Sequence, residues 1–550
     1  MRDPEPHPAT LAELVRGLAE RYGESEALVQ GDRRIDFAGL ERASAELALG
    51  LVAGGAGKGT RIALLMPNGP DCVIAWLAAA RIGALVIPLS TFYPARELHW
   101  VLRHADVHTL LCRDRYLNHD YLERLEKLAP SLAGSAGPPL YLPELPFLRA
   151  VWAWGGGERS WARHGPGGLA EQGRETPGVD EALLRELEDC VSPADPTLII
   201  YTSGSTAEPK GAVHTHGAIL RHTRSVNEYL PSGPGDSCFF PAPFFWVGGL
   251  QRQIHTLYGG ACTLFLESFD AADAIDLIER EGATHLMVWP HQAKAIREHP
   301  RFAGLDLSRL RSAPFDFLPQ ERRPSAPDRV PNIIGMTETF AHHTIEAAGT
   351  ELPPEKRGAC GRALPGMERR IVDLGNGRPA APGELGELWV RGPTVTQGLY
   401  KREREEVFTP DGFYRTGDRG AIDADDYYFF HGRLGDMIKT GGANVSPREV
   451  EGVLLSLDEI EQACVVGIED PEMGQIVVAA AVPAAEPPDE VELRARLREL
   501  LSAFKVPRRF LWLASGELPL TDSGKLHPGR VRELVRRRLA ADGSDPAHEG

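Results

Sequence analysis

The feature that most restricts the fold is a repeated alternation of short apolar runs with segments of helical pattern. Residues 61–66 (RIALLM) form such a run, residues 71–82 fit a helix, and residues 84–88 (ALVIP) form the next run. Strand-length apolar runs recur at residues 109–112, 151–154, 198–202, 261–266 and 285–289. Buried strands that alternate with helices are typical of parallel sheets. The pattern therefore predicts an α/β fold with a large N-terminal domain.

The C-terminal part of the sequence has a different texture. From residue 383, short alternating strands (GELWVRG, DGFYRTGD, YYFFHGR) predict a small β-barrel-like subdomain. Beyond it, a glycine-rich turn leads into a helix that begins at Ser446-Pro447, followed by further strands and a charged helix. We therefore expect a domain at residues 1–434 and a small, mobile α+β domain at residues 435–550.

One stretch, residues 155–195, lacks periodicity and is rich in Gly, Glu and Arg. This composition predicts a mobile surface loop followed by a short helix at residues 179–188. We assign the stretch no function.

Composition excludes several classes of protein. The 60 lysines and arginines against 77 aspartates and glutamates give a net charge of −17, which argues against a nucleic-acid binder. The 7 cysteines form no CxxC and no paired spacing, so we expect a reduced, cytoplasmic protein without a cysteine-based zinc site. The first residues carry no apolar signal core, and Arg81 interrupts the most apolar region, so no transmembrane segment is expected.

The most informative stretch is residues 198–211, LIIYTSGSTAEPKG. A buried strand leads into a loop of small and hydroxylated residues that ends near Lys210. Such a loop can wrap a polyphosphate with backbone amides and hydroxyls, while the lysine supplies a point charge. The spacing GxxxxGK[ST] of a Walker A loop is absent.

Four further strings follow in order: IGMTE (334–338), YRTGD (414–418), GRLGDMIKTGGANVSPREVE (432–451) and LPLTDSGK (518–525). Together with YTSGSTxxPKG they resemble the motifs of the adenylate-forming superfamily, which includes acyl-CoA synthetases, peptide-synthetase adenylation domains and luciferases. The resemblance covers residues 10–538. Five motifs in one order make chance agreement negligible.

The resemblance implies two half-reactions that use ATP, Mg²⁺ and coenzyme A. A carboxylate first attacks the α-phosphate of ATP and releases pyrophosphate, and a thiol then displaces AMP to give a thioester. In this chemistry the protein mainly positions groups and stabilises charge. The implied catalytic set is Lys210, Thr337, Glu338 and Lys525.

The resemblance also implies a role for each nucleotide-binding residue. The β- and γ-phosphates are expected to contact Thr202, Ser203, Gly204, Ser205, Thr206 and Lys210. Thr337 is expected at the α-phosphate and Glu338 at Mg²⁺, while Asp418 and Arg433 reach the ribose. Ile334 and Gly335 are expected at the adenine, with Ile334 in place of a stacking tyrosine.

The family rotates its C-terminal domain between the half-reactions, and here the pivot residue is Gly435. Glycine tolerates a wide range of backbone angles, as a pivot requires. Rotation would withdraw Lys525 from the α-phosphate and bring Lys439, Gly441 and Gly442 to a channel for the coenzyme A thiol.

The resemblance places the acyl pocket at Phe245, Trp246, Gly249, Ser312, Gly335 and Met336. These windows are apolar, and residues 241–250 hold no acid that could bind an amino group, so an apolar or aromatic carboxylic acid is expected. His342 and His343 are adjacent and could contact the substrate, but histidines lie more often at the surface, where we expect them. Three alternatives stay open: an acyl-carrier protein as thiol acceptor, a non-catalytic nucleotide-binding relative, and a homodimer.

Overall fold

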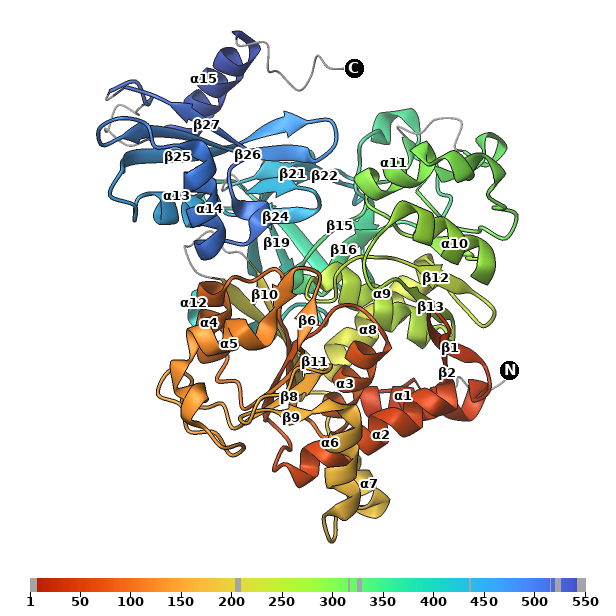
Figure 1. Ribbon diagram of the computed structural model, residues 1–550. Coiled ribbons are helices and arrows are strands. Elements are labelled where there is room, and N and C mark those ends of the chain that lie inside the picture. Colours follow the sequence, from red (N-terminus) through yellow and green to blue (C-terminus); the bar gives the residue numbers. More distant parts are fainter. Residues whose placement is uncertain are drawn as a thin grey trace.

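The computed structural model describes residues 7–202, 209–314, 317–323, 329–434, 437–514, 516–519 and 526–541. Within these ranges the chain forms a large N-terminal body and a smaller C-terminal lobe, which is blue in Figure 1. The body combines parallel sheets with helices, so the predicted α/β class is confirmed. The exact boundary near residue 435 stays a prediction.

The larger sheet has eight strands in the order β20-β11-β10-β4-β3-β5-β8-β9. From β10 to β9 all neighbours are parallel, whereas β11 and β20 are antiparallel. The bounds are β3 Arg61–Leu65, β4 Leu85–Pro88, β5 Thr109–Arg113, β8 Ala150–Trp154, β9 Arg163–His164, β10 Pro196–Thr202, β11 Lys210–Thr215 and β20 Gly398–Leu399.

Both faces of this sheet are buried. Along β3, Ile62 and Leu64 join one hydrophobic cluster, and Ala63 and Leu65 join another. This explains the unbroken apolar runs in the sequence, because strands covered on both faces do not alternate with polar residues. The covering helices are α1 Leu11–Tyr22, α2 Phe37–Ala53, α3 Pro70–Arg81, α4 Ala95–His104 and α5 Tyr121–Leu128.

A second, five-stranded sheet has the order β14-β12-β13-β1-β2 and lies beside the first (Figure 1). Its strands are β1 Glu26–Gln30, β2 Arg33–Asp36, β12 Ser237–Phe239, β13 Cys262–Phe265 and β14 His285–Leu286. The accompanying helices are α8 His216–Tyr229, α9 Val247–Tyr258, α10 Ala271–Glu281 and α11 Pro290–Glu298. Helix α9 packs against α8 and against the strand β16 described next.

Two antiparallel sheets follow. One contains β15 Ile334–Met336, β16 Ala341–Ile345 and β17 Arg362–Ala363, and the other contains β18 Glu368–Val372, β19 Gly386–Arg391, β21 Tyr414–Ile422 and β22 Tyr428–Arg433. The lobe is built on β23 Ile438–Thr440, β24 Ala443–Val445, β25 Ile460–Asp470, β26 Gly474–Pro483 and β27 Arg509–Trp512. Its helices are α13 Pro447–Leu454, α14 Glu490–Leu500 and α15 Pro528–Ala541.

Within residues 155–195 the predicted short helix is confirmed as α7 Glu181–Asp189, but the loop predicted before it is wrong, because that part contains β9 and the helix α6 Gly165–Glu175. Helix α6 packs so closely on α2 that a Cβ added at Gly50 would lie 2.0 Å from the Leu169 carbonyl oxygen, and one at Gly173 would lie 2.8 Å from the Gly50 nitrogen. Gly173 therefore serves close helix packing, which composition alone cannot distinguish from a loop.

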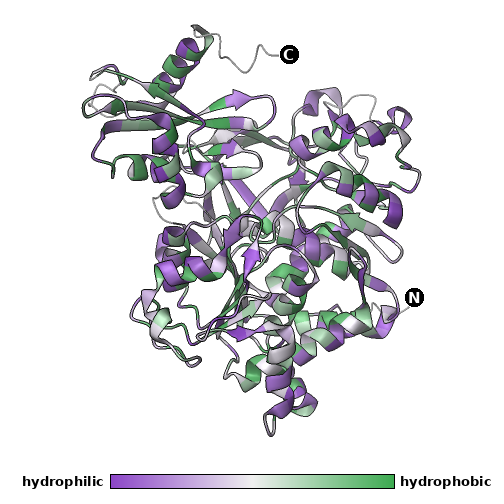
Figure 2. Ribbon diagram, viewed as in Figure 1, coloured by the Kyte–Doolittle hydropathy of each residue, from purple (hydrophilic) through white to green (hydrophobic). Residues whose placement is uncertain are grey.

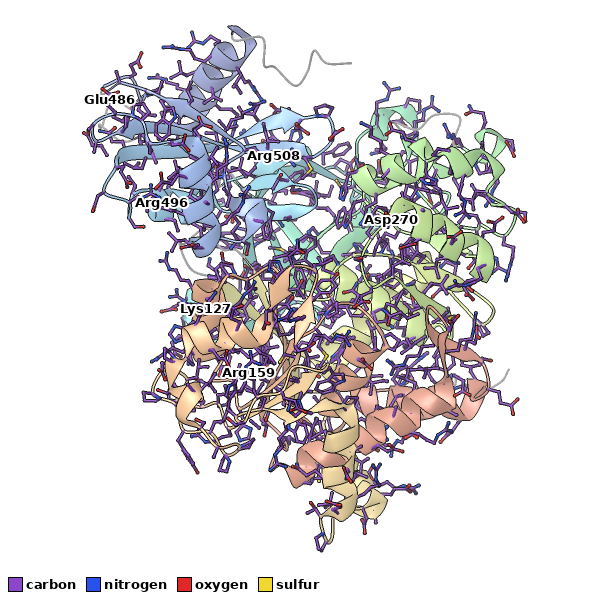
Figure 3. The ribbon with its side chains drawn as sticks, in the orientation of Figure 1. Lys127, Arg159, Asp270, Glu486, Arg496 and Arg508 are labelled. Atoms are coloured by element: carbon purple, nitrogen blue, oxygen red, sulfur yellow. The ribbon has the colours of Figure 1, made fainter. Side chains whose placement is uncertain are left out.

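Hydrophobic residues concentrate in the interior strands, and hydrophilic residues lie mostly on the outer helices (Figure 2). Charged side chains such as Lys127, Asp270 and Glu486 lie at the periphery in Figure 3. Across the described ranges, none of the helices combines the length and the apolar character needed to span a bilayer.

Candidate active site

A cavity of about 290 Å³ lies between the N-terminal body and the C-terminal lobe. Its lining includes Thr202 at the end of β10, Gly335 on β15, and Thr337 just beyond that strand. The lobe contributes Gly442 and Asn444 from the β23–β24 hairpin. Ligands of open α/β sheets usually bind at the carboxyl ends of the parallel strands, which is where this cavity opens.

The predicted phosphate loop connects β10 to β11. These strands are antiparallel neighbours, and Thr202 lies directly opposite Lys210 in their register. The first and last residues of the predicted phosphate-binding set are therefore adjacent, one of them at the cavity. The residues between them in that set, Ser203, Gly204, Ser205 and Thr206, lie outside the described ranges.

Thr337 is held in place by a buried histidine of β11. The His214 Nε2 atom lies 2.8 Å from the Thr337 carbonyl oxygen. Burial lowers the pKa of His214 to about 4, so the ring is neutral at neutral pH and donates through Nε2. Because Lys210 begins the same strand, β11 positions both predicted phosphate ligands.

Gly335 lies where the β15–β16 hairpin is most tightly packed. A Cβ added there would lie 1.9 Å from the Ala341 carbonyl oxygen, so no other residue fits without a backbone shift. The hairpin turn contains Phe340 and Ala341 at positive φ. It is stabilised by the Thr339 hydroxyl, which donates to the Ala341 carbonyl oxygen at 2.6 Å.

Glu338 contacts the next motif along the chain. The Tyr414 hydroxyl donates to Glu338 Oε1 at 2.9 Å, and the Thr396 amide donates to the Glu338 carbonyl oxygen at 2.6 Å. Among the described residues no three His, Cys, Asp or Glu side chains are grouped to hold a metal ion. A single oriented carboxylate nevertheless fits Mg²⁺, which usually binds through one or two carboxylates together with substrate phosphates.

Asp418 and Arg433, the two predicted ribose ligands, are brought together by the register of β21 and β22, in which they are paired residues. Asp418 is 1% exposed, and its amide donates to the Thr416 hydroxyl oxygen at 3.0 Å. The antiparallel pairing thus explains how motifs fifteen residues apart form one site.

An aromatic wall forms one side of the cavity. Phe245 and Trp246 line it, whereas Phe244 points into the core against Phe265. The Trp246 ring packs edge-on against Trp289, with 6.5 Å between centroids, and against Phe504 of the lobe at 6.4 Å. Val247, Gly248 and Gly249 continue the lining into the first turn of α9.

Ile334, Met336 and Ser312 do not line this cavity, and the roles predicted for them, Ile334 at the adenine and the other two at the acyl group, stay predictions. Ile333 lines the cavity, while Ile334 packs against the hydrophobic cluster of the antiparallel sheets and Met336 is buried. The reason is strand alternation, which sends neighbouring side chains of β15 to opposite faces. Ser312 is exposed and bridges to His285 at the edge of the second sheet, away from the cavity lining.

The β23–β24 hairpin brings part of the predicted thiol channel to the cavity. Gly441 and Gly442 both have positive φ (55° and 84°), and a Cβ added at Gly442 would lie 3.1 Å from the Trp289 ring. Lys439 lies outside the cavity lining, with its ammonium 5.0 Å from the Phe430 ring centroid. Lys525 and the predicted pivot Gly435 lie outside the described residues.

Sequence reasoning missed a buried charge cluster at the junction of body and lobe. The Lys505 ammonium lies 3.0 Å from Glu97 Oε2 on α4 and 2.7 Å from Glu449 Oε1 on α13. The Ser502 amide and hydroxyl both donate to Glu97 at 2.9 Å. Burial alone would lower the pKa of Lys505, but the carboxylates, Glu97 first, outweigh it and raise that pKa.

The prediction that His342 and His343 lie at the surface is wrong. His343 is fully buried, and His342 lines the cavity. Side chains alternate along β16, so the His342 and His343 rings lie on opposite faces of the strand. Both faces are covered, and α9 packs against this strand. Burial holds the pKa of His342 well below its usual value.

Comparison with known proteins gives concordant matches. Residues 15–400 match the family model described as AMP-binding enzyme, and residues 449–525 match the AMP-binding enzyme C-terminal domain. The feruloyl-CoA synthase of an Amycolatopsis species is 31% identical, with 92% of this chain and 95% of that protein covered. The indoleacetate–CoA ligase of Aromatoleum aromaticum is 30% identical, with 92% and 94% covered.

Among solved structures, the amide bond synthetase McbA from Marinactinospora thermotolerans superposes with a TM-score of 0.75. It is 26% identical to this chain, and the match covers 96% of this chain and 99% of that one. The family matches span both the body and the lobe, on either side of the cavity described above. The chain therefore belongs to the adenylate-forming family of AMP-binding enzymes, as an acyl-CoA synthetase.

Proposed function

We propose that this acid–thiol ligase activates a carboxylic acid with a largely apolar or aromatic body and transfers it to coenzyme A. The single observation that carries the proposal is the cavity itself. One wall is aromatic, with Phe245 and Trp246, and the residues predicted to contact the α-phosphate and the thiol channel, Thr337 and Gly442, line the same space.

In the first half-reaction, a carboxylate oxygen of the acid attacks the α-phosphorus of ATP, and the bond to the pyrophosphate oxygen breaks. Thr202 and Lys210 bind the leaving phosphates together with the loop between them, and Thr337 binds the α-phosphate. Asp418 and Arg433 hold the ribose. Glu338 would hold Mg²⁺, which would supply neutralisation of the charge on the departing pyrophosphate.

Lys525 approaches the reacting carboxylate and the α-phosphate during this step. Its compact ammonium suits a moving catalytic group better than a planar guanidinium does. Among the 60 lysines and arginines of the chain, the residues at this motif and at the phosphate loop, Lys525 and Lys210, are both lysines. Lys525→Ala is expected to abolish acyl-adenylate formation while sparing thioester formation from supplied acyl-AMP, and equal loss of both steps would contradict the role.

In the second half-reaction, the thiol sulfur attacks the acyl carbon, the carbon–oxygen bond to AMP breaks, and the thiol proton is released. The arrangement of the lobe favours this step, because Gly442 and Asn444 lie at the cavity. A groove of about 510 Å³ lies next to the cavity, with Pro209 shared between their linings. Arg96 and Arg103 line this groove and offer positive charge to the phosphates of coenzyme A.

The test is pyrophosphate release across a panel of short, long, branched, aromatic and polycyclic acids, followed by identification of the acylated product. We expect acid-dependent release of pyrophosphate and an acyl-CoA thioester when coenzyme A is present. Acylation of a holo-carrier protein or of an amine in preference to coenzyme A would contradict the assignment of the acceptor. Absence of release with every acid would favour a non-catalytic nucleotide-binding role.

A further inference from the structure

Arg252 is a partly buried arginine of α9, the helix whose first turn lines the acyl cavity. It follows Gly248 by one helical turn on α9, and Gly248 lines the cavity. Leu250 and Ile254, on the opposite face of the helix, pack into the core. The geometry of α9 thus directs Arg252 away from the hydrophobic cluster. Its side chain does not line the cavity, but it lies close enough to His342, which does, for its charge to help lower the pKa of that ring.

No carboxylate of the described part of the chain pairs with Arg252. Its one hydrogen bond runs from Nη1 to the Nδ1 atom of His255 at 3.3 Å, and its Nε is buried without a partner. Asp236, just before strand β12, accepts from Arg311 Nη1 at 2.7 Å. Burial lowers the pKa of Arg252, and an enclosed charge without a counter-ion is costly to maintain.

The rings around Arg252 do not neutralise it. Burial holds the pKa of His255 and His342 well below the usual value, so both are uncharged at neutral pH. Burial also lowers the pKa of His222 to about 3 and lowers that of His285. The positive charge of Arg252 is therefore surrounded by neutral imidazoles, and a bound ligand could supply the hydrogen-bond acceptor that it lacks.

His342 supplies a second polar group at the same place. Its ring lines the cavity, and its Nε2 atom is buried with no hydrogen-bond partner. The backbone is fixed by His222, whose Nε2 lies 3.0 Å from the His342 carbonyl oxygen. At Gly248 an added Cβ would meet nothing within 4 Å, so space is open above the start of α9.

We infer that the acid activated by this chain carries an oxygen acceptor, a second carboxylate or a carbonyl, at the end remote from the reacting carboxylate, and that Arg252 and His342 bind it. The inference rests on the proposed function and narrows it. In this arrangement the aromatic wall contacts the apolar middle of the acyl group, and Gly335 and Thr337 adjoin its reacting carboxylate. The Arg252 guanidinium binds the oxygen acceptor at the remote end. Buried groups left unpaired by an alkyl terminus make the site selective against plain fatty acids.

The test compares matched acids on the full-length enzyme with ATP, Mg²⁺ and coenzyme A. Straight-chain acids of several lengths are each supplied in three forms: with a terminal methyl group, with a ketone next to the terminal carbon, and with a second carboxylate. Values of kcat/KM come from pyrophosphate release. We expect the acceptor-bearing acids to exceed the alkyl acid at the best length by at least about tenfold. The ketone and carboxylate forms distinguish a neutral acceptor from an anionic one.

Arg252→Met should abolish this preference by lowering kcat/KM for the acceptor-bearing acids at least about tenfold without lowering it for the alkyl acids, because the methionine keeps the bulk and loses the donors. Arg224→Met is the matched control, because Arg224 is exposed and paired with Glu228 on α8. It should change neither the preference for acceptor-bearing acids nor kcat/KM for the alkyl acids. Arg252→Lys retains the charge and should keep part of the preference for the dicarboxylic acid, which covers the case in which the methionine variant does not fold.

The inference would be overturned if the alkyl acid had the higher kcat/KM at every length, or if Arg252→Met lowered kcat/KM equally for all acids. Either result would leave the proposed function intact. Absence of pyrophosphate release with every acid would contradict both. The two failures are therefore distinguishable from the same set of measurements.

Discussion

At the scale of single residues, the site depends on close approaches that few side chains tolerate. Gly335 is the clearest case, because the Ala341 carbonyl oxygen occupies the space where a Cβ would stand. The same hairpin carries Thr337, whose carbonyl oxygen is fixed by the neutral ring of His214. Small displacements here move a predicted phosphate ligand, and positioning is the main contribution of the protein to this chemistry.

We predict that Gly335→Ala lowers acid-dependent pyrophosphate release by at least about 100-fold, since misplacement of about 1 Å can cost that much. The melting temperature should fall as well, because backbone must shift to admit the methyl group. Gly248→Ala is the control: its Cβ has open space, and it should retain the melting temperature. Normal release by the Gly335 variant would contradict the account of the hairpin.

Single residues also show what the sequence could and could not reveal. The motif residues Thr202, Thr337, Glu338 and Asp418 were identifiable because each lies in a short string that resembles a motif of the family. Lys505 carries no such local signal, because its partner Glu97 lies 408 positions away. Arg252 was hidden in the same way, since only the packing of α9 shows that no carboxylate of the described residues pairs with it.

At the scale of elements, the lobe docks through α4 and α13. Glu97 of α4 and Glu449 of α13 enclose the Lys505 ammonium, and all three side chains are at least nine-tenths buried. Burial raises the pKa of Glu449, while Lys505 opposes that effect. A second, exposed pair joins the two parts of the molecule, Lys294 with Glu472 at 2.9 Å. Buried and exposed pairs should contribute very differently to docking.

Lys505→Met should slow thioester formation from supplied acyl-AMP by at least about tenfold, because two buried carboxylates are left without their cation. Pyrophosphate release should be much less affected if, as the resemblance predicts, that step uses another orientation of the lobe. Lys294→Met, which removes only the exposed pair, should change neither rate by more than about twofold. Equal slowing of both half-reactions by Lys505→Met would argue that the cluster stabilises the fold in general rather than this orientation.

The elements themselves were predicted unevenly. The parallel strands were recognisable because burial on both faces leaves continuous apolar runs, as in β3 and β4. Helix α6 was not, because its glycine-rich sequence looks like a loop when neighbours such as α2, which Gly173 approaches closely, are unknown. A motif also fixes a residue's position along the chain but not the face of the strand on which it lies, as the alternation of Ile334 and Gly335 on β15 shows.

At the scale of the whole molecule, an unusual number of histidines are buried and neutral. Burial lowers the pKa of His214 and His216 to about 4 and that of His222 to about 3. His255 and His342 are shifted in the same direction. In the unfolded chain these rings take up a proton near pH 6.5, so the unfolded state binds more protons over the interval below that value.

The free energy of unfolding should therefore fall steadily as pH decreases from about 6.5 to about 4. Urea unfolding at pH 7, 6 and 5 measures this directly, and His222→Gln should reduce the slope over the same interval. Acidic side chains with a lowered pKa, such as Asp411 at about 2, lose their contribution below about pH 5 and do not explain a loss between pH 7 and pH 5. A midpoint that stays constant between pH 7 and pH 5 would contradict the buried, neutral state of these rings.

The central claim is that the acid is activated through a mixed anhydride with AMP before the thiol attacks. The most direct test supplies the acid with both carboxylate oxygens as ¹⁸O and analyses the AMP formed together with acyl-CoA. The account predicts one ¹⁸O atom in the phosphate of each AMP, because the attacking oxygen stays on phosphorus when the thiol displaces AMP. AMP without the label would show that the carboxylate never bonded to the α-phosphorus, and would contradict the account.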